Sequence, residues 1–167
     1  MEKQKQLQYP SFKNLNPATQ ASSKSKRANQ SRNTRHEIIL RSALHRMGLR
    51  FRKNLKSLPG NPDIVFPKAK TVIFCDGDFW HGRDWNARKS KISKGTNPKY
   101  WIEKIEANVR RDREVNELLI KAGWDVVRIW ETDIHSNLET VAKKIEKLVK
   151  TKTKNQIENG SLRRFKF

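Results

Sequence analysis

An α/β fold, with a central mixed sheet flanked by helices, is the architecture that this sequence predicts. Two short apolar runs, 63–66 and 71–75, are rich in β-branched and aromatic residues, as strands are. Apolar residues on either side of these runs repeat at helical spacing, and a third strand-like run, 124–130, follows a long helical stretch. The order helix, strands, helix, strand, helix is typical of a sheet covered by helices.

The first helix is expected to begin after Thr34, because Thr34 and Glu37 fit a capping box in front of an apolar run. Gly48 is placed to end this helix. A strand is expected within 49–54, and the Pro- and Gly-containing segment 57–62 turns the chain. The apolar positions that repeat at helical spacing are Leu40, Ala43, Leu44 and Met47.

The two apolar runs should pair as an antiparallel hairpin, because the connection 67–70 is too short for a crossover helix. Asp63 opens the first run and Asp76 follows the second, so their carboxylates should meet at one edge of the sheet. Such a pair is unfavourable unless a cation or a proton is shared. Carboxylates are ligands for hard divalent cations such as Mg²⁺. The hairpin therefore predicts a metal site suited to cleaving a nucleic-acid backbone.

The second half of the chain predicts two helices around one strand. Asn97 and Pro98 are suited to the cap and the first position of a helix that runs to Ala122, and Gly123 ends it. The strand 124–130 follows, with Trp124 and Trp130 in the core. A last amphipathic helix is expected over 137–149, and 83–99 is expected to be a basic loop.

Composition points to a polyanionic partner. The 167 residues contain 37 Lys and Arg against 17 Asp and Glu, a formal net charge of +20. Neutralisation of phosphates dominates non-specific nucleic-acid binding, so double-stranded DNA is the expected partner. An anionic membrane surface or another protein is the alternative. No apolar stretch is long enough to span a membrane or resembles a signal peptide, so we expect a soluble protein inside the cell.

Three regions follow from these patterns. Residues 1–33 are polar and basic and predict a flexible arm, which either tracks phosphates or has no role. Residues 34–150 form the predicted folded domain, and 151–167 a basic C-terminal tail. The single cysteine, Cys75, excludes an internal disulfide framework and a multi-cysteine zinc site.

Two further carboxylates fall on the inward sides of predicted helices. Asp112 shares a stripe with the apolar residues of its helix, where a carboxylate is costly unless paired. It either forms a structural ion pair or holds a catalytic histidine or a metal-bound water. Glu37 lies at the edge of the first helix's inward stripe and has either a catalytic role or only the capping role.

His81 lies a few residues after the predicted hairpin, in a segment dense in glycine and aromatic residues. Histidine is the usual general base at neutral pH, although a lone histidine is more often structural. Its closeness in sequence to Asp76 favours the catalytic interpretation.

Aromatic residues and cations alternate around the predicted basic loop. Aromatic side chains can stack on bases or wedge between base steps while cations bind phosphates, or else they belong to the core. The aromatic candidates are Phe79, Trp80, Tyr100 and Trp101, and the cations are Arg83, Arg88, Lys89, Lys91, Lys94 and Lys99.

Several stretches together resemble the very short patch repair (Vsr) endonucleases. They are Leu58-Pro59-Gly60-Asn61-Pro62-Asp63, 72–81, 101–105, 108–113, Gly123-Trp124 and Trp130-Glu131. The similarity covers about Asn33 to Trp130. It implies a restriction-endonuclease-like fold of the PD-(D/E)xK superfamily and Mg²⁺-dependent nicking of DNA 5′ to the thymine of a T:G mismatch.

The resemblance also implies roles for individual residues. Asp63 corresponds to the essential metal-binding aspartate, and Cys75 to the position whose backbone carbonyl contributes to metal coordination. His81 corresponds to the histidine that activates water, Asp112 to the aspartate that supports it, and Glu37 to the glutamate of the first helix. The aromatic residues that wedge into the duplex correspond to Phe79, Trp80 and Trp101.

The sequence departs from the family pattern in two places. Asp76 stands where the repair enzymes generally have a histidine, so it is a further candidate metal ligand. The family's structural zinc ligands are replaced, so structural zinc is predicted to be absent; the replacing residues are Asp78, Arg83, Trp85 and Thr132.

Together these patterns predict a monomeric Mg²⁺-dependent DNA endonuclease, cytoplasmic and associated with the nucleoid, with mismatch-repair proteins as possible partners. Two alternatives stay open. One is a Vsr-like site-specific or homing-type enzyme that cuts unmismatched DNA, and the other is a non-catalytic DNA-binding module.

Overall fold

The computed structural model describes residues 32–164, with side chains through residue 158. These residues divide into two compact units. The helical unit comprises 77–114, and the sheet unit comprises 32–76 and 115–164. Each is described by itself below. The predicted N-terminal arm lies outside the described residues except for its last two positions.

The sheet unit contains the mixed sheet that the sequence predicts. Its strands are β1 (Arg52–Lys53), β2 (Ile64–Phe66), β3 (Thr71–Asp76) and β4 (Asp125–Trp130), in that spatial order. β1–β2 and β2–β3 pair antiparallel, and β3–β4 pairs parallel. The predicted hairpin is confirmed, with Ile64 opposite Ile73 and a turn closed by a hydrogen bond from the Lys70 N–H to the Pro67 carbonyl.

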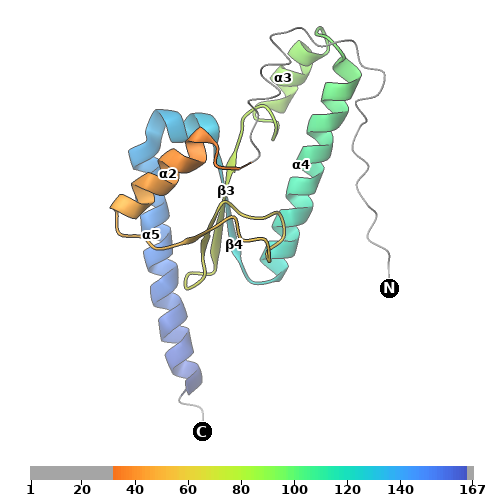
Figure 1. The fold of residues 1–167 in the computed structure, drawn as a ribbon. Helices are drawn as coiled ribbons and strands as arrows, with labels where there is room; N and C mark the ends of the chain where they lie inside the picture. The colour runs from red at the N-terminus through yellow and green to blue at the C-terminus, as the bar shows by residue number, and fades with distance from the viewer. Residues whose placement is uncertain (1–31, 165–167) are drawn as a thin grey trace, which may run out of the picture. The chain divides into compact units, whose positions relative to one another are not determined.

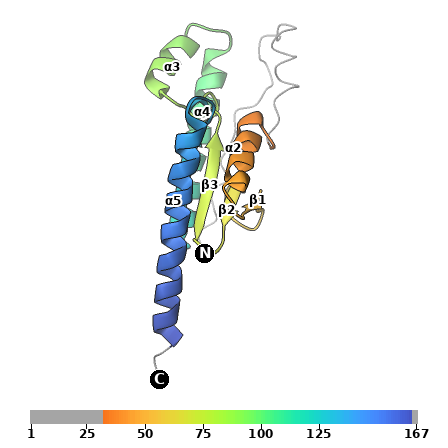
Figure 2. The ribbon, with the colours of Figure 1, turned by 90° about the vertical axis from the view of Figure 1, so that its left-hand side faces the viewer.

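Helices cover both faces of this sheet. α2 (Arg35–Arg46) and α5 (Glu131–Arg164) pack on one face, over Ile64, Ile73 and Ile129 (Figure 1, Figure 2). The other face holds Val65, Val72 and Phe74, which pack against Leu119 from the last turns of α4 (Pro98–Lys121). Alternate residues of each strand point to opposite faces, so a strand buried on both faces has a continuous apolar sequence. This explains the two apolar runs.

Both predicted glycine stops are confirmed. Gly48 follows α2 and Gly123 follows α4, each with a φ of +78°, which L side chains rarely adopt.

Three boundaries differ from the prediction. α3 (Trp85–Ile92) lies within the segment expected to be a loop; none of its residues is buried, so it has no apolar stripe to reveal it. The predicted strand within 49–54 is reduced to β1. α5 begins at Glu131, is interrupted by non-helical Asn137, and continues to Arg164, so the expected C-terminal tail is largely helical.

None of the helices in the described part of the chain is both long and apolar enough to cross a membrane.

Candidate active site

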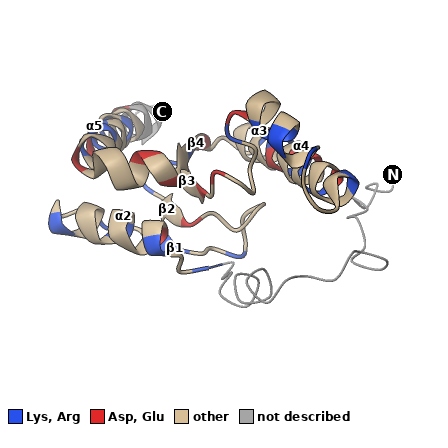
Figure 3. Cartoon of the chain, turned by 90° about the horizontal axis from the view of Figure 1, so that it is seen from above, with Lys and Arg blue, Asp and Glu red and all other residues tan. Residues whose placement is uncertain are grey.

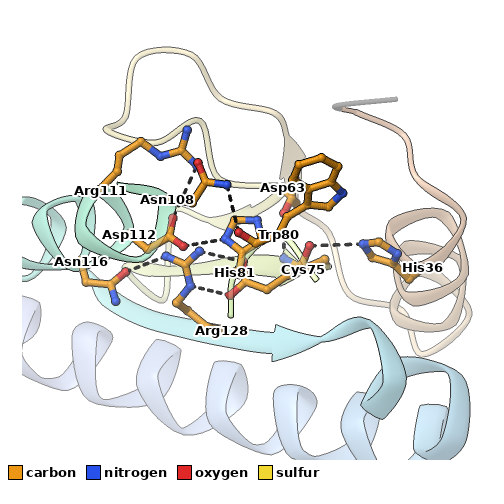
Figure 4. A network of polar contacts seen from close by, with 11 residues as sticks. His36, Asp63, Cys75, Trp80, His81, Asn108, Arg111, Asp112, Asn116 and Arg128 are labelled. Carbon is orange, nitrogen blue, oxygen red and sulfur yellow. Dashed lines mark hydrogen bonds and ion pairs between the residues drawn. The ribbon is translucent and has the colours of Figure 1, made fainter. Parts of the chain in front are cut away.

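Asp63 connects the start of β2 to the end of β3. Its N–H donates to the Ile73 carbonyl (3.1 Å), and its Oδ2 accepts a hydrogen bond from the Cys75 N–H (2.8 Å; Figure 4). The N–H and C=O of one strand residue point to the same side, as do those of residues two apart. The carbonyls of Ile73 and Cys75 therefore face β2. The pairs between β2 and β3 run from Phe66 opposite Thr71 to Ile64 opposite Ile73, so Cys75 lies beyond the last pair.

The Asp63 carboxyl is a partly buried acid whose charge is poorly compensated. Burial raises its pKa from 3.8 to about 7, and the negative charges of Glu37 and Asp76 act in the same direction. The Cys75 N–H and the Arg41 guanidinium oppose this rise without cancelling it. A carboxylate in such surroundings favours a bound proton or cation. Together with the Cys75 carbonyl, it offers the oxygen ligands that Mg²⁺ prefers.

Asp76 lies near Asp63, as the hairpin predicts, but its charge is already paired. Arg128 on β4 donates from Nε to Asp76 Oδ2 (2.5 Å) and from Nη2 to Oδ1 (2.7 Å). Arg128 Nη1 also donates to Asn116 Oδ1 (3.2 Å). A buried carboxylate is tolerable when it is paired in this bidentate way. A metal-binding role for Asp76 stays a prediction, and it would require sharing this carboxylate with Arg128.

Glu37 makes the capping contacts that the sequence predicts as the alternative to a catalytic role. Its carboxylate accepts hydrogen bonds from the Thr34 N–H (3.2 Å), the Asn33 N–H (3.1 Å) and the Thr34 hydroxyl (2.7 Å). Arg41 Nη2 lies 3.5 Å from Glu37 Oε2. The predicted capping contact is confirmed, and a catalytic role for Glu37 stays a prediction.

Cys75 offers its backbone rather than its thiol. The side chain belongs to the apolar core, and burial raises the pKa of the thiol well above its ordinary value. A neutral buried thiol is a poor metal ligand. The Cys75 carbonyl, by contrast, is polar and lies 3.3 Å from His36 Nε2.

The helical unit contains a histidine–carboxylate pair. His81 Nδ1 lies 2.6 Å from Asp112 Oδ2, and Arg111 Nη2 lies 3.6 Å from the other Asp112 oxygen (Figure 4). The Asp112 side chain is 13% exposed, which confirms its inward position on α4. A carboxylate bound to Nδ1 fixes the tautomer and the orientation of the imidazole. This arrangement matches the support that the sequence assigns to Asp112.

Gly82 allows the turn that follows His81. Its φ is +73°, and a Cβ there would lie 3.0 Å from a methyl of Val109 on α4. The segment is also fixed by the ion pair of Arg83 with Asp78 (3.7 Å) and by the hydrogen bond from the Arg83 N–H to the Asp78 carbonyl (3.1 Å). These contacts lie where the sequence predicts that zinc ligands have been replaced; the absence of structural zinc stays a prediction.

The predicted wedge residues form one aromatic cluster. The ring centroids of Phe79 lie 5.2 Å from Trp80 and 5.7 Å from Trp101, and those of the two tryptophans are 5.9 Å apart. Asn108 on α4 donates to the Trp80 carbonyl (3.0 Å) and so holds this segment. These three rings are partly exposed, whereas Tyr100 is buried beneath Trp101 and belongs to the core alternative.

The basic candidates differ in whether their side chains already form contacts within the helical unit. Lys89 pairs with Glu106 (2.7 Å), and Arg88 Nε donates to the Arg83 carbonyl (3.1 Å). Lys91 is exposed on α3. These four cations, Arg83 included, lie on or beside α3, whereas Lys94 follows α3 and Lys99 lies on the first turn of α4.

Sequence reasoning missed three polar residues that support these groups. Arg128 could have been noticed as the one charged residue inside the apolar run 126–130. His36 and Asn108 carry no comparable signal, because their partners, the Cys75 and Trp80 carbonyls, are backbone atoms distant in sequence.

Comparisons with known proteins are consistent with this geometry. A family model described as DNA mismatch endonuclease Vsr matches residues 15–87. The type II nicking enzyme V.NmeDIP of Neisseria meningitidis serogroup C is 46% identical over 125 residues, 75% of this chain and 83% of that enzyme. V.HpaIIP of Haemophilus parainfluenzae, also a type II nicking enzyme, is 42% identical over 74% of this chain and 86% of its own length. The DNA mismatch endonuclease Vsr of Escherichia coli strain K12 is 41% identical over 109 residues, 65% of this chain and 68% of that enzyme.

The raised pKa of Asp63 predicts a pH-dependent stability. Because the folded pKa of about 7 exceeds the ordinary 3.8, the folded protein binds this proton more tightly than the unfolded chain does. Wild-type stability should therefore fall as pH rises from about 4 to about 7. Asp63→Asn keeps an oxygen acceptor for the Cys75 N–H and replaces the carboxyl with a group that cannot ionise. Its free energy of unfolding should exceed that of wild type by on the order of 4 kcal/mol at pH 8, and by much less at pH 4.

Urea denaturation in EDTA at several pH values measures this difference. Asp125→Asn is the matched control, since Asp125 is a half-exposed carboxylate paired with Lys152. Its effect should stay within about 1 kcal/mol throughout. An Asp63→Asn effect that does not change with pH would contradict the prediction.

Proposed function

We propose, since this chain belongs to the Vsr family of DNA endonucleases, that it nicks one strand of duplex DNA 5′ to the thymine of a T:G mismatch and requires Mg²⁺. The raised pKa of the partly buried Asp63 carboxyl, beside a backbone carbonyl, is the observation that carries the metal requirement. One relative is named a DNA mismatch endonuclease and others are named nicking enzymes, which supports the nicking reaction.

Asp63 and the Cys75 carbonyl are the groups that would hold the ion. The fit rests on the uncompensated charge of Asp63 and on the two groups lying at one edge of the hairpin. When bound, Mg²⁺ supplies positive charge to the phosphate and lowers the pKa of bound water. Glu37 and Asp76 add negative potential at Asp63, which favours the cation even while both carboxylates make other contacts.

His81 is the proposed general base. Asp112 accepts the Nδ1–H and so fixes the tautomer in which Nε2 would take a proton from the attacking water. As the proton arrives, the Asp112 carboxylate stabilises the imidazolium. Asp112 is thus a positioning residue, which acts on the reaction through His81.

We infer that Asp63 and His81 serve one reaction. The inference rests on the covalent chain, since only residues 77–80 separate Asp76 at the end of β3 from His81. Hydrolysis of a phosphodiester needs both charge stabilisation and proton transfer, which are the roles proposed for Asp63 and His81.

DNA binding is supported by charge and by the aromatic cluster. Lys and Arg occur on the helices of both units (Figure 3), and the chain's formal net charge is +20. Phe79, Trp80 and Trp101 present partly exposed rings that could insert beside a base pair. A T:G wobble pair is easier to unstack than a matched pair, so insertion would favour mismatched DNA.

A second candidate function is nicking of a specific unmismatched sequence. The printed names of several relatives, type II nicking enzymes, specify no mismatch and favour keeping this alternative. Both candidates use the same acidic site and differ only in the DNA substrate.

Metal dependence is tested by plasmid nicking. Supercoiled DNA that contains target sites should be converted to the open circle with Mg²⁺ and should stay intact with excess EDTA. Asp63→Asn should lose at least about 10²-fold in rate, because it removes the negative ligand, yet should bind DNA as wild type does. Asp125→Asn should nick normally. Undiminished nicking by Asp63→Asn would remove Asp63 from the site.

The histidine pair is tested by a double-mutant cycle. His81→Ala should lower the single-turnover rate by about 10²–10⁴ at neutral pH. If Asp112 acts through His81, Asp112→Asn should cost less, and adding it to His81→Ala should cost little more. His45→Ala, an exposed position on α2, is the control. Fully additive losses would contradict a shared role.

Mismatch specificity is tested with two duplexes of one sequence that differ only in T:G against T:A. Wild type should cleave the T:G duplex at least tenfold faster. Phe79→Ala and Trp80→Ala should reduce this ratio more than they reduce total DNA affinity, because wedging acts on the opened stack. Equal cleavage of both duplexes by wild type would favour the sequence-specific alternative.

A further inference from the structure

Three potential metal ligands meet in the sheet unit where α2 packs on α5. They are His36 on the first turn of α2 and Glu131 and His135 on the first turns of α5. One ligand atom from each lies within 4.8 Å of those of the other two. Among the described residues, this is the one group of three or more His, Cys, Asp or Glu side chains gathered so closely.

The helices bring these residues together for simple reasons. Glu131 and His135 are four residues apart, so they project from the same side of α5. His36 is 6% exposed and belongs to the first turn of α2, whose buried side packs on α5. His135 is exposed, which leaves the group accessible from solvent.

The hydrogen bonds of His36 identify which ring nitrogen is free to bind a metal. Its Nε2 lies 3.3 Å from the Cys75 carbonyl and 3.0 Å from the Thr34 hydroxyl oxygen. The carbonyl can only accept, and the Thr34 hydroxyl donates its own proton to Glu37. Nε2 therefore carries the hydrogen, and the lone pair of the neutral ring is on Nδ1.

Nδ1 faces Glu131, at a distance that suits a bridging ion better than a direct hydrogen bond. It lies 3.6 Å from Glu131 Oε1, which is beyond normal hydrogen-bond length. Two ligand atoms about 2.1 Å from one tetrahedral ion are roughly 3.4 Å apart. Histidine ligands of metals also typically donate their second N–H to a carbonyl, as His36 does here.

We propose that His36, Glu131 and His135 bind a zinc-class transition metal, with a fourth position open to water. Two imidazoles and one carboxylate suit Zn²⁺ and its neighbours Co²⁺ and Ni²⁺, whereas Mg²⁺ prefers oxygen ligands alone. The site is distinct from the proposed Mg²⁺ site at Asp63 and uses none of the positions at which structural zinc is predicted to be absent.

A metal at this site would have two consequences for the fold. It would join the first turns of α2 and α5, which both cover the sheet. It would also fix the His36 ring and, with it, the hydrogen bond to the Cys75 carbonyl. This second consequence rests on the proposed function, in which that carbonyl holds the catalytic ion.

Zinc binding by the full-length protein tests the proposal. After treatment with EDTA and its removal, the protein competes for Zn²⁺ with a chromophoric indicator. Wild type and Asp63→Asn should both bind one equivalent with a Kd in the micromolar range or below. His135→Gln and Glu131→Gln, which alter partly or fully exposed side chains, should weaken binding at least about tenfold. His45→Gln, on α2 outside the group, should bind as wild type does.

Thermal unfolding gives a second readout. Zn²⁺ should raise the Tm of wild type by several degrees and leave that of His135→Gln unchanged. Failure of wild type to bind Zn²⁺ below about 100 µM, or equal binding by His135→Gln, would overturn the proposal. His135→Gln should still nick DNA with Mg²⁺ alone. Failure of wild type to nick DNA would contradict the proposed function but would not affect the conclusion about zinc binding.

Discussion

The hydrogen bond from the Cys75 N–H to the Asp63 carboxylate is the contact on which the chemistry of the sheet unit depends. It holds a carboxylate at the point where β2 begins and where β3 continues beyond its pairing with β2. The surrounding core removes water from that carboxylate, which raises its pKa to about 7. The folded protein thereby keeps an acid that is unfavourable as a bare anion, and a cation restores the balance. In the proposed function, this loss of stability without metal accompanies affinity for Mg²⁺.

The neighbouring carboxylates of Asp76 and Glu37 make close hydrogen bonds and ion pairs, and this difference is why we propose Asp63 as the metal ligand. Asp76 is neutralised by the bidentate contact with Arg128. Glu37 accepts two backbone N–H groups and the Thr34 hydroxyl at the start of α2. Both still contribute negative potential at Asp63. Pairing two of the three acids keeps the desolvation cost tolerable, while the third retains its demand for a positive charge.

In the helical unit, one largely buried carboxylate orients a histidine ring while neighbouring aromatic rings stay partly exposed. Asp112 is largely buried on α4 and fixes His81 through Nδ1, so that the ring is restrained before substrate arrives. The rings of Phe79, Trp80 and Trp101 contact one another yet stay partly exposed. His36 provides a comparable restraint in the sheet unit, since its Nε2–H bonds to the Cys75 carbonyl while Nδ1 faces Glu131. In each case a hydrogen bond to the protein fixes the orientation of the imidazole ring.

Local sequence signals determined the hairpin, the capping contact of Glu37, the glycine stops and the inward position of Asp112. Each depends on residues a few positions apart, so the spacing of apolar residues and the length of a turn were sufficient to predict it. The family resemblance implied the contact of His81 with Asp112, whereas tertiary structure alone decided that Arg128 neutralises Asp76 and that His36 meets Glu131 and His135. The sequence did not predict that α3 is helical, because this helix buries no residue and so has no apolar stripe. These pairings join segments distant along the chain, so they depend on how the helices and strands of each unit pack together and not on local spacing.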